Sequence, residues 1–224
     1  MNNEEVFALT WAADDLFRRE GIENRLPVLR KIDGPWTRLC AHVSWKEALK
    51  ASEQPDFGET LAQFETDIAN ELSAFDKDER VVIADEVCSG AGWLLDPAVI
   101  KQVLIPLYKR MLAPIETSIG FHSDGNISEL FEDLSDAGFS FVHLASVNYV
   151  ELPTIVHNAQ YNALTPYGGI SSQTLEEGPL SNEIRAMLGE LVSNEGLIVC
   201  DDAGMTTGQQ LDAFLGELNA IPLY

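Results

Sequence analysis

The stretch Val81-Val82-Ile83-Ala84-Asp85-Glu86 places four apolar residues in succession directly before two carboxylates. A strand that is apolar on both faces is typical of a parallel sheet buried between two layers. In such sheets, ligands bind at the carboxyl ends of the strands. The stretch therefore predicts a buried parallel strand that ends at a ligand site.

The same order of strand, polar loop and helix recurs along the chain. Residues 118–121 predict a strand that ends at His122, and residues 196–199 predict one followed by Cys200-Asp201-Asp202. Further strands are predicted at 26–32, 37–43, 140–144 and 162–167, and helices at 4–20, 57–74, 96–112, 126–138, 179–192 and 207–218. Repeated units of this kind indicate an α/β protein with a parallel sheet.

The number of predicted strands, about seven, is close to that of an eight-stranded barrel. With 224 residues the chain is compact for that fold, for which about 250 residues is typical. We therefore expect one domain over residues 1–224, a TIM-type (β/α) barrel trimmed at its N-terminus. An open, doubly wound sheet is the alternative.

The charge is strongly unbalanced, with 36 acidic against 14 basic residues and a net charge of −22. Nucleic acids and anionic membranes are therefore not expected as partners, because both are bound through Lys/Arg patches. The acidic start has no apolar segment after it, so no export signal is predicted. The three cysteines, Cys40, Cys88 and Cys200, are then expected to be free thiols in the cytoplasm.

Potential metal ligands follow two of the predicted strands. His122 and Asp124 are two residues apart, so on an extended segment both side chains point the same way. Cys200 offers a thiolate as a third ligand, and His, Asp and Cys all bind Zn²⁺. In the alternative interpretation, Cys200 is a buried core residue and His122 bonds to Asp124 or to a carbonyl.

The pair Asp85-Glu86 ends another strand. Glu86 is a further candidate ligand and Asp85 a candidate acid or base, although two carboxylates can also simply cap or solvate a loop. Among the remaining histidines, His42 is expected near the same strand ends, His143 in the core and His157 on the surface. The chain contains no nucleophile elbow, dinucleotide fingerprint or Walker loop.

Four stretches, taken in order and with their spacing, are similar to a known family. They are Gly34-Pro35-Trp36-Thr37-Arg38-Leu39, the segment from Trp93 to Arg110, the segment from Phe121 to Gly138, and Gly168-Gly169-Ile170-Ser171 with Leu175. In these stretches the chain resembles the uroporphyrinogen decarboxylase-like superfamily, which includes corrinoid- and thiol-dependent methyltransferases. The resemblance implies an α/β barrel.

The resemblance also implies a ligand set. The methyltransferase branch holds zinc through a His-x-Cys pair and a later Cys. His122 matches the His, Asp124 takes the place of the first Cys, and Cys200 falls where the later Cys is expected. Some members add a carboxylate from an earlier strand, for which Glu86 is the candidate.

We therefore expect a zinc-dependent methyltransferase that moves a methyl group between a corrinoid, or another methyl donor, and a thiol-type acceptor. Asp85 or Asp202 would orient the ligands. A corrinoid carrier protein is the expected partner, and a homodimer would help to close the site. The alternatives are a non-catalytic binding or scaffold relative, a uroporphyrinogen decarboxylase-like lyase, and a metal-free lyase that uses His122 and Asp85 as an acid–base pair.

Overall fold

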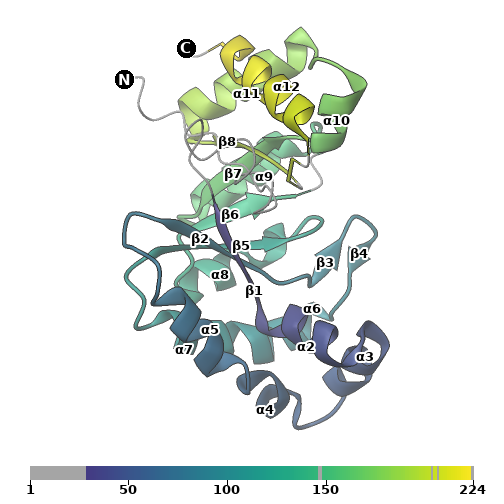
Figure 1. Cartoon of the computed structure of the whole chain (residues 1–224), viewed down its shortest axis with the longest axis vertical. Helices are drawn as coiled ribbons and strands as arrows, with labels where there is room; N and C mark the ends of the chain where they lie inside the picture. Colours follow the sequence, from purple (N-terminus) through teal and green to yellow (C-terminus); the bar gives the residue numbers. More distant parts are fainter. Residues whose placement is uncertain (1–28, 146–147, 203, 206, 223–224) are drawn as a thin grey trace. The chain divides into compact units, whose positions relative to one another are not determined.

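A largely parallel six-stranded sheet with the strand order β1-β2-β5-β6-β7-β8 is the centre of the fold (Figure 1). The computed structural model describes residues 29–145, 148–202, 204–205 and 207–222. This sheet and its helices confirm the predicted α/β class. Barrel closure is not detected in the part of the chain described, where β1 and β8 stand at the two ends of the strand order.

The chain divides into two compact units, which are described one at a time. The β5 unit comprises Arg30–Val142, and the β8 unit comprises Leu29 together with the described residues from His143 onward. The boundary falls within β6 (Phe141–Leu144). The expectation of one domain over residues 1–224 stays a prediction.

The β5 unit contains three parallel strands, a short hairpin and a series of helices. Its strands are β1 (Arg30–Asp33), β2 (Arg80–Ala84) and β5 (Ser118–Ser123), and its hairpin is β3 (Cys88–Ser89) with β4 (Gly92–Trp93). Its helices are α2 (Pro35–Val43), α3 (Trp45–Ser52), α4 (Phe57–Ala62), α5 (Glu65–Leu72), α6 (Pro97–Val99), α7 (Ile105–Leu112) and α8 (Phe131–Ala137). A π-helical segment, η2 (Ile100–Leu104), precedes α7, and a 3-10 turn, η3 (Ser128–Leu130), precedes α8.

The β8 unit pairs its last two strands in parallel. These strands are β7 (Thr165–Ile170) and β8 (Ile198–Asp201), and the helices are α9 (Leu152–Tyr161), α10 (Ser172–Glu177), α11 (Asn182–Glu195) and α12 (Gly208–Ala220). Thr207 forms the predicted capping box with Gln210 at the start of α12, which satisfies free backbone donors of the first turn.

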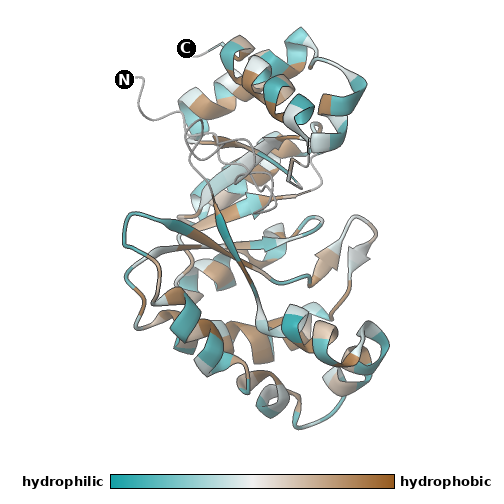
Figure 2. Ribbon diagram, in the orientation of Figure 1, coloured by the Kyte–Doolittle hydropathy of each residue, from teal (hydrophilic) through white to brown (hydrophobic). Residues whose placement is uncertain are grey.

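The core of the β5 unit is built on β2 and β5. Val81, Val82 and Ile83 have no exposed surface, as the unbroken apolar run predicted. On the helix-covered face, the rings of Tyr108, Phe121 and Phe139 pack edge to face, with centroids 5.4 to 5.7 Å apart. The helices carry both hydrophilic and hydrophobic bands (Figure 2), because one face of each is buried.

One predicted element is of the wrong kind. Residues 37–43, expected as a strand, lie in helix α2. Pro35 is at the first turn of this helix, and the buried residues Trp36, Leu39 and Cys40 recur at helical spacing. The helix begins where a carboxylate distant in sequence, that of Asp85, accepts hydrogen bonds from the backbone N–H groups of Trp36 and Thr37.

Other predictions differ in extent. The helix expected at 57–74 is broken into α4 and α5, and the strand expected at 162–167 is displaced to β7. The strand expected at 26–32 corresponds to β1 at Arg30–Asp33, as far as it lies within the described residues. The helix expected at 4–20 lies outside the described residues.

The segment from Asp96 to Leu112 is helical as predicted, but it is not a regular α-helix. Asp96 caps it by accepting a hydrogen bond from the N–H of Ala98, at 2.8 Å. The π-helical segment η2 comes before Pro106, where a kink was expected. Among the described residues, no helix has the length and apolar character needed to cross a membrane.

Candidate metal centre

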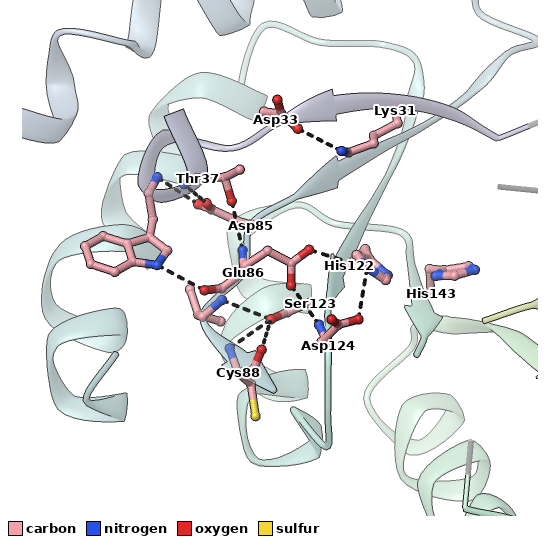
Figure 3. Close-up of polar contacts among 12 residues, drawn as sticks. Lys31, Asp33, Thr37, Asp85, Glu86, Cys88, His122, Ser123, Asp124 and His143 are labelled. Carbon is pink, nitrogen blue, oxygen red and sulfur yellow. Dashed lines mark hydrogen bonds and ion pairs between the residues drawn. The ribbon is translucent and has the colours of Figure 1, made fainter. Parts of the chain in front are cut away.

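Three potential ligands come together at the carboxyl ends of two neighbouring strands of the β5 unit (Figure 3). His122 is the fifth residue of β5, and its backbone pairs with that of Ala84, the last residue of β2. Glu86 follows β2 and Asp124 follows β5. One ligand atom from each of these three side chains lies within 4.8 Å of the other two.

The separations within this cluster suit a shared metal ion. Nε2 of His122 is 3.7 Å from a carboxylate oxygen of Glu86 and 3.8 Å from one of Asp124. Both separations are too long for hydrogen bonds. Bonds of about 2.0 to 2.2 Å to a tetrahedral ion hold neighbouring ligand atoms roughly 3.3 to 3.6 Å apart, so small side-chain adjustments would complete the geometry.

The three candidate ligands differ in how far their side chains are exposed to solvent. The His122 side chain is only 5% exposed, that of Glu86 is 28% exposed, and that of Asp124 is 53% exposed. Burial raises the pKa of Glu86, and the neighbouring carboxylates of Asp124 and Asp85 raise it further, while the N–H of Asp124 and the charge of Lys31 lower it. Two acidic groups facing one imidazole form a site of negative charge that a cation would neutralise.

Asp85, next to Glu86 in sequence, points toward α2 and α7. It is fully buried, and its oxygens accept hydrogen bonds from the Tyr108 hydroxyl at 2.5 Å and from the N–H groups of Trp36 and Thr37 at 3.2 and 2.6 Å. Burial raises the pKa of Asp85 to about 6, although these hydrogen bonds lower it. These contacts suit an orienting role, and a catalytic role for Asp85 stays a prediction.

The other two predicted site residues lie in the β8 unit. Cys200 is buried in β8, where burial and the nearby Asp201 raise the pKa of its thiol well above the ordinary value. Asp202 follows the strand and accepts a hydrogen bond from the N–H of Ser172 at 2.9 Å. Neither residue belongs to the cluster of Glu86, His122 and Asp124, and their roles as ligand and orienting carboxylate stay predictions.

Sequence reasoning missed two residues that support the site. Ser123 lies between two of the candidate ligands, and its hydroxyl binds the loop after β2. The hydroxyl of Thr37 accepts a hydrogen bond from the N–H of Glu86. Ser123 stands within the His122-Ser123-Asp124 motif, so the motif itself held the signal. No local signal pointed to Thr37, because its partner is 49 residues away.

The remaining histidines are sorted by the structure. His143 is fully buried in β6 and His157 is exposed on α9, as predicted for core and surface residues. His42 lies on the exposed side of the last turn of α2, which was expected to be a strand.

The burial of His143 predicts that the folded protein loses stability at acidic pH. Burial lowers its pKa to about 4, although the carbonyl of Asp201 and the charge of Asp202 oppose this, whereas the unfolded chain titrates near 6.5. As the pH falls, the imidazole of His143 therefore becomes protonated in the unfolded state at a higher pH than in the folded state. The contribution of His143 is complete above pH 6.5 and falls by up to about 3 kcal/mol as the pH drops toward 4.

Denaturant unfolding of the wild type and of His143→Gln at pH 7 and pH 4.5 measures this effect. The free energy of unfolding of the wild type should fall relative to that of the variant at the lower pH. The raised pKa of Asp85 acts in the opposite direction but is common to both proteins, so it cancels in the difference. An equal difference at both pH values would contradict the prediction.

The fold and the site together define an α/β protein with a candidate metal centre at the carboxyl ends of two parallel strands. No protein-family model matches the chain, and no curated protein matches it by sequence. Among solved structures, a methyltransferase from Methanosarcina mazei is similar in fold, with a TM-score of 0.64 and 20% identity, over 93% of this chain and 67% of that chain. At this identity the likeness concerns the fold.

Proposed function

We propose that the protein is a zinc-dependent methyltransferase that transfers a methyl group from a corrinoid, or another methyl donor, to a thiol-type acceptor. The observation that carries the proposal is the convergence of Glu86, His122 and Asp124 at the ends of β2 and β5. The fold likeness to a methyltransferase supports the class of reaction.

Each residue has a distinct part in this proposal. His122, Glu86 and Asp124 hold the ion, and the exposed position of Asp124 leaves one side of the cluster open to solvent and substrate. Zn²⁺ bound there would lower the pKa of an acceptor thiol and keep it as a thiolate at neutral pH. A bound cation would also neutralise the two carboxylates, which otherwise repel each other and an incoming thiolate.

The transfer is a displacement at the methyl carbon. The thiolate sulfur would form the new bond to the methyl carbon, and the electron pair of the carbon–cobalt bond would remain with a corrinoid donor, whose cobalt would be reduced by two electrons. The thiol proton leaves to solvent when the thiolate forms. A carrier protein would deliver the corrinoid.

The choice of zinc rests on the resemblance, because a nitrogen ligand with two carboxylates also suits harder divalent ions, whereas a thiolate favours zinc. Cys200 and Asp202 lie in the β8 unit, and their roles as ligand and orienting group stay predictions.

A direct assay tests the proposed reaction. Zinc-loaded protein is incubated with methylated free corrinoid and a small thiol, and thioether formation is followed by mass spectrometry together with the visible spectrum of the corrinoid. We expect metal-dependent thioether formation that stops on chelation and returns with added Zn²⁺. The proposal would be overturned if zinc-loaded protein formed thioether no faster than the protein-free background with each of several thiols.

A further inference from the structure

The loop that carries Glu86 is held in place by its backbone. The N–H of Glu86 donates to the hydroxyl of Thr37 at 2.9 Å, and its carbonyl accepts from the indole N–H of Trp36 at 3.0 Å. Both partners belong to α2. These two contacts fix the start of the loop. Further along, the carbonyl of Val87 accepts from the N–H groups of Leu94 and Leu95, and Cys88 pairs with Trp93 in the β3–β4 hairpin, but neither contact reaches β5.

Ser123 joins this part of the loop to β5. Its hydroxyl oxygen accepts hydrogen bonds from the N–H groups of Val87 at 3.0 Å and Cys88 at 2.9 Å (Figure 3). Ser123 has no exposed surface, so water does not compete for these bonds. Val87 N–H is shared with the carbonyl of Asp85 at 2.8 Å. The contact to Cys88 therefore adds the constraint that Asp85 does not supply.

The contact is reciprocal. While the Ser123 side chain binds the loop after Glu86, the backbone N–H of Asp124 donates to the Glu86 carboxylate at 3.1 Å. Gly125 then passes so close to the carbonyl of Ser89 that a Cβ atom would collide with it, and its φ of 82° also favours glycine. The Ser123 hydroxyl and the Asp124 N–H thus hold segments 122–125 and 86–89 together, and the absence of a side chain at Gly125 lets the two segments approach closely.

We propose that Ser123 is a positioning residue of the Glu86–His122–Asp124 site, and that it fixes the distance between the ligand of one strand and those of the next. This rests on the proposed metal site. Alternation along β5 turns the Ser123 side chain away from the ligands that flank it, toward the loop. It therefore acts through Glu86 and does not touch the ion.

The test compares Zn²⁺ affinities by competition with a chromophoric chelator in the full-length protein. Ser123→Ala removes the acceptor and is expected to weaken Zn²⁺ binding about 10- to 100-fold, the usual effect of losing a group that orients a ligand. Ser118→Ala is the matched control, because it removes a hydroxyl from the other end of the same strand, where it bonds to Ser140 at 2.7 Å. The visible spectrum of the Co²⁺-loaded proteins reports the ligand geometry.

An affinity loss and an altered Co²⁺ spectrum in Ser123→Ala alone would support the inference. Wild-type affinity and spectrum in Ser123→Ala would overturn it and leave the metal site standing. A wild type that binds neither ion would overturn the metal site and this inference together. If Ser123→Ala does not fold, Ser123→Gly makes the same comparison, because it removes the same hydroxyl without adding a potential ligand atom.

Discussion

His122→Ala is expected to lower the affinity for Zn²⁺ about 10²- to 10³-fold and to leave the purified protein without stoichiometric metal. Four-ligand protein sites bind Zn²⁺ with roughly 10 to 16 kcal/mol, so one ligand accounts for about 3 to 4 kcal/mol. His122 is also the most buried of the three clustered ligands, and it faces both carboxylates. Its loss removes the one nitrogen ligand of the cluster.

Elemental analysis of untagged protein measures the effect. His157→Ala is the matched control, since His157 lies exposed on α9 in the other unit. Cys200→Ala tests the prediction that Cys200 is a metal ligand in the same experiment. About one zinc per chain in the wild type, lost in His122→Ala and kept in His157→Ala, is the expected result. Zinc retained at full stoichiometry by His122→Ala would place the metal elsewhere.

Asp85→Ala is expected to destabilise the protein by about 3 to 4 kcal/mol. The carboxylate is the acceptor for two backbone N–H groups at the start of α2 and for the Tyr108 hydroxyl, all in a buried setting. Each buried donor left without an acceptor costs about 1 to 3 kcal/mol, and loss of the raised-pKa carboxylate returns part of this. The variant also leaves a small cavity.

Two milder variants divide this effect. Tyr108→Phe removes only the hydroxyl bond and should cost about 1 to 1.5 kcal/mol. Asp85→Asn keeps one oxygen acceptor but turns a donor toward donors, so its cost should lie between the other two. Urea unfolding at pH 7 gives all three values. A loss below 1 kcal/mol for Asp85→Ala would contradict the anchoring role inferred from the contacts.

The sequence predicted the strand ends better than the helices. An unbroken apolar run predicts β2, and a short apolar segment that stops at His122 predicts β5. Because neighbouring parallel strands end at one edge, their polar residues could be expected together. That reasoning selected Glu86, His122 and Asp124 as candidate ligands, and these three side chains do lie together in the structure.

What the sequence could not reveal depends on contacts between distant residues. Helix α2 begins where Asp85 accepts N–H groups from residues 49 and 48 positions earlier, so no local capping signal marks it. The spacing of Leu39 and Val43 suits one face of a strand as well as one face of a helix, so the pattern of this short segment does not decide between the two. The support that Thr37 and Ser123 give to the loop after β2 likewise becomes visible only once the strands are paired.

The π-helical segment at Ile100–Leu104 sets the rotational phase of the helix that follows it. A π-turn holds about one residue more than an α-turn. Because each residue turns an α-helix by about 100°, α7 is rotated by about that much relative to an uninterrupted α-helix. The resulting phase is the one in which Tyr108 reaches Asp85. Deleting one residue from this segment would turn Tyr108 away and leave that carboxylate without its hydroxyl donor.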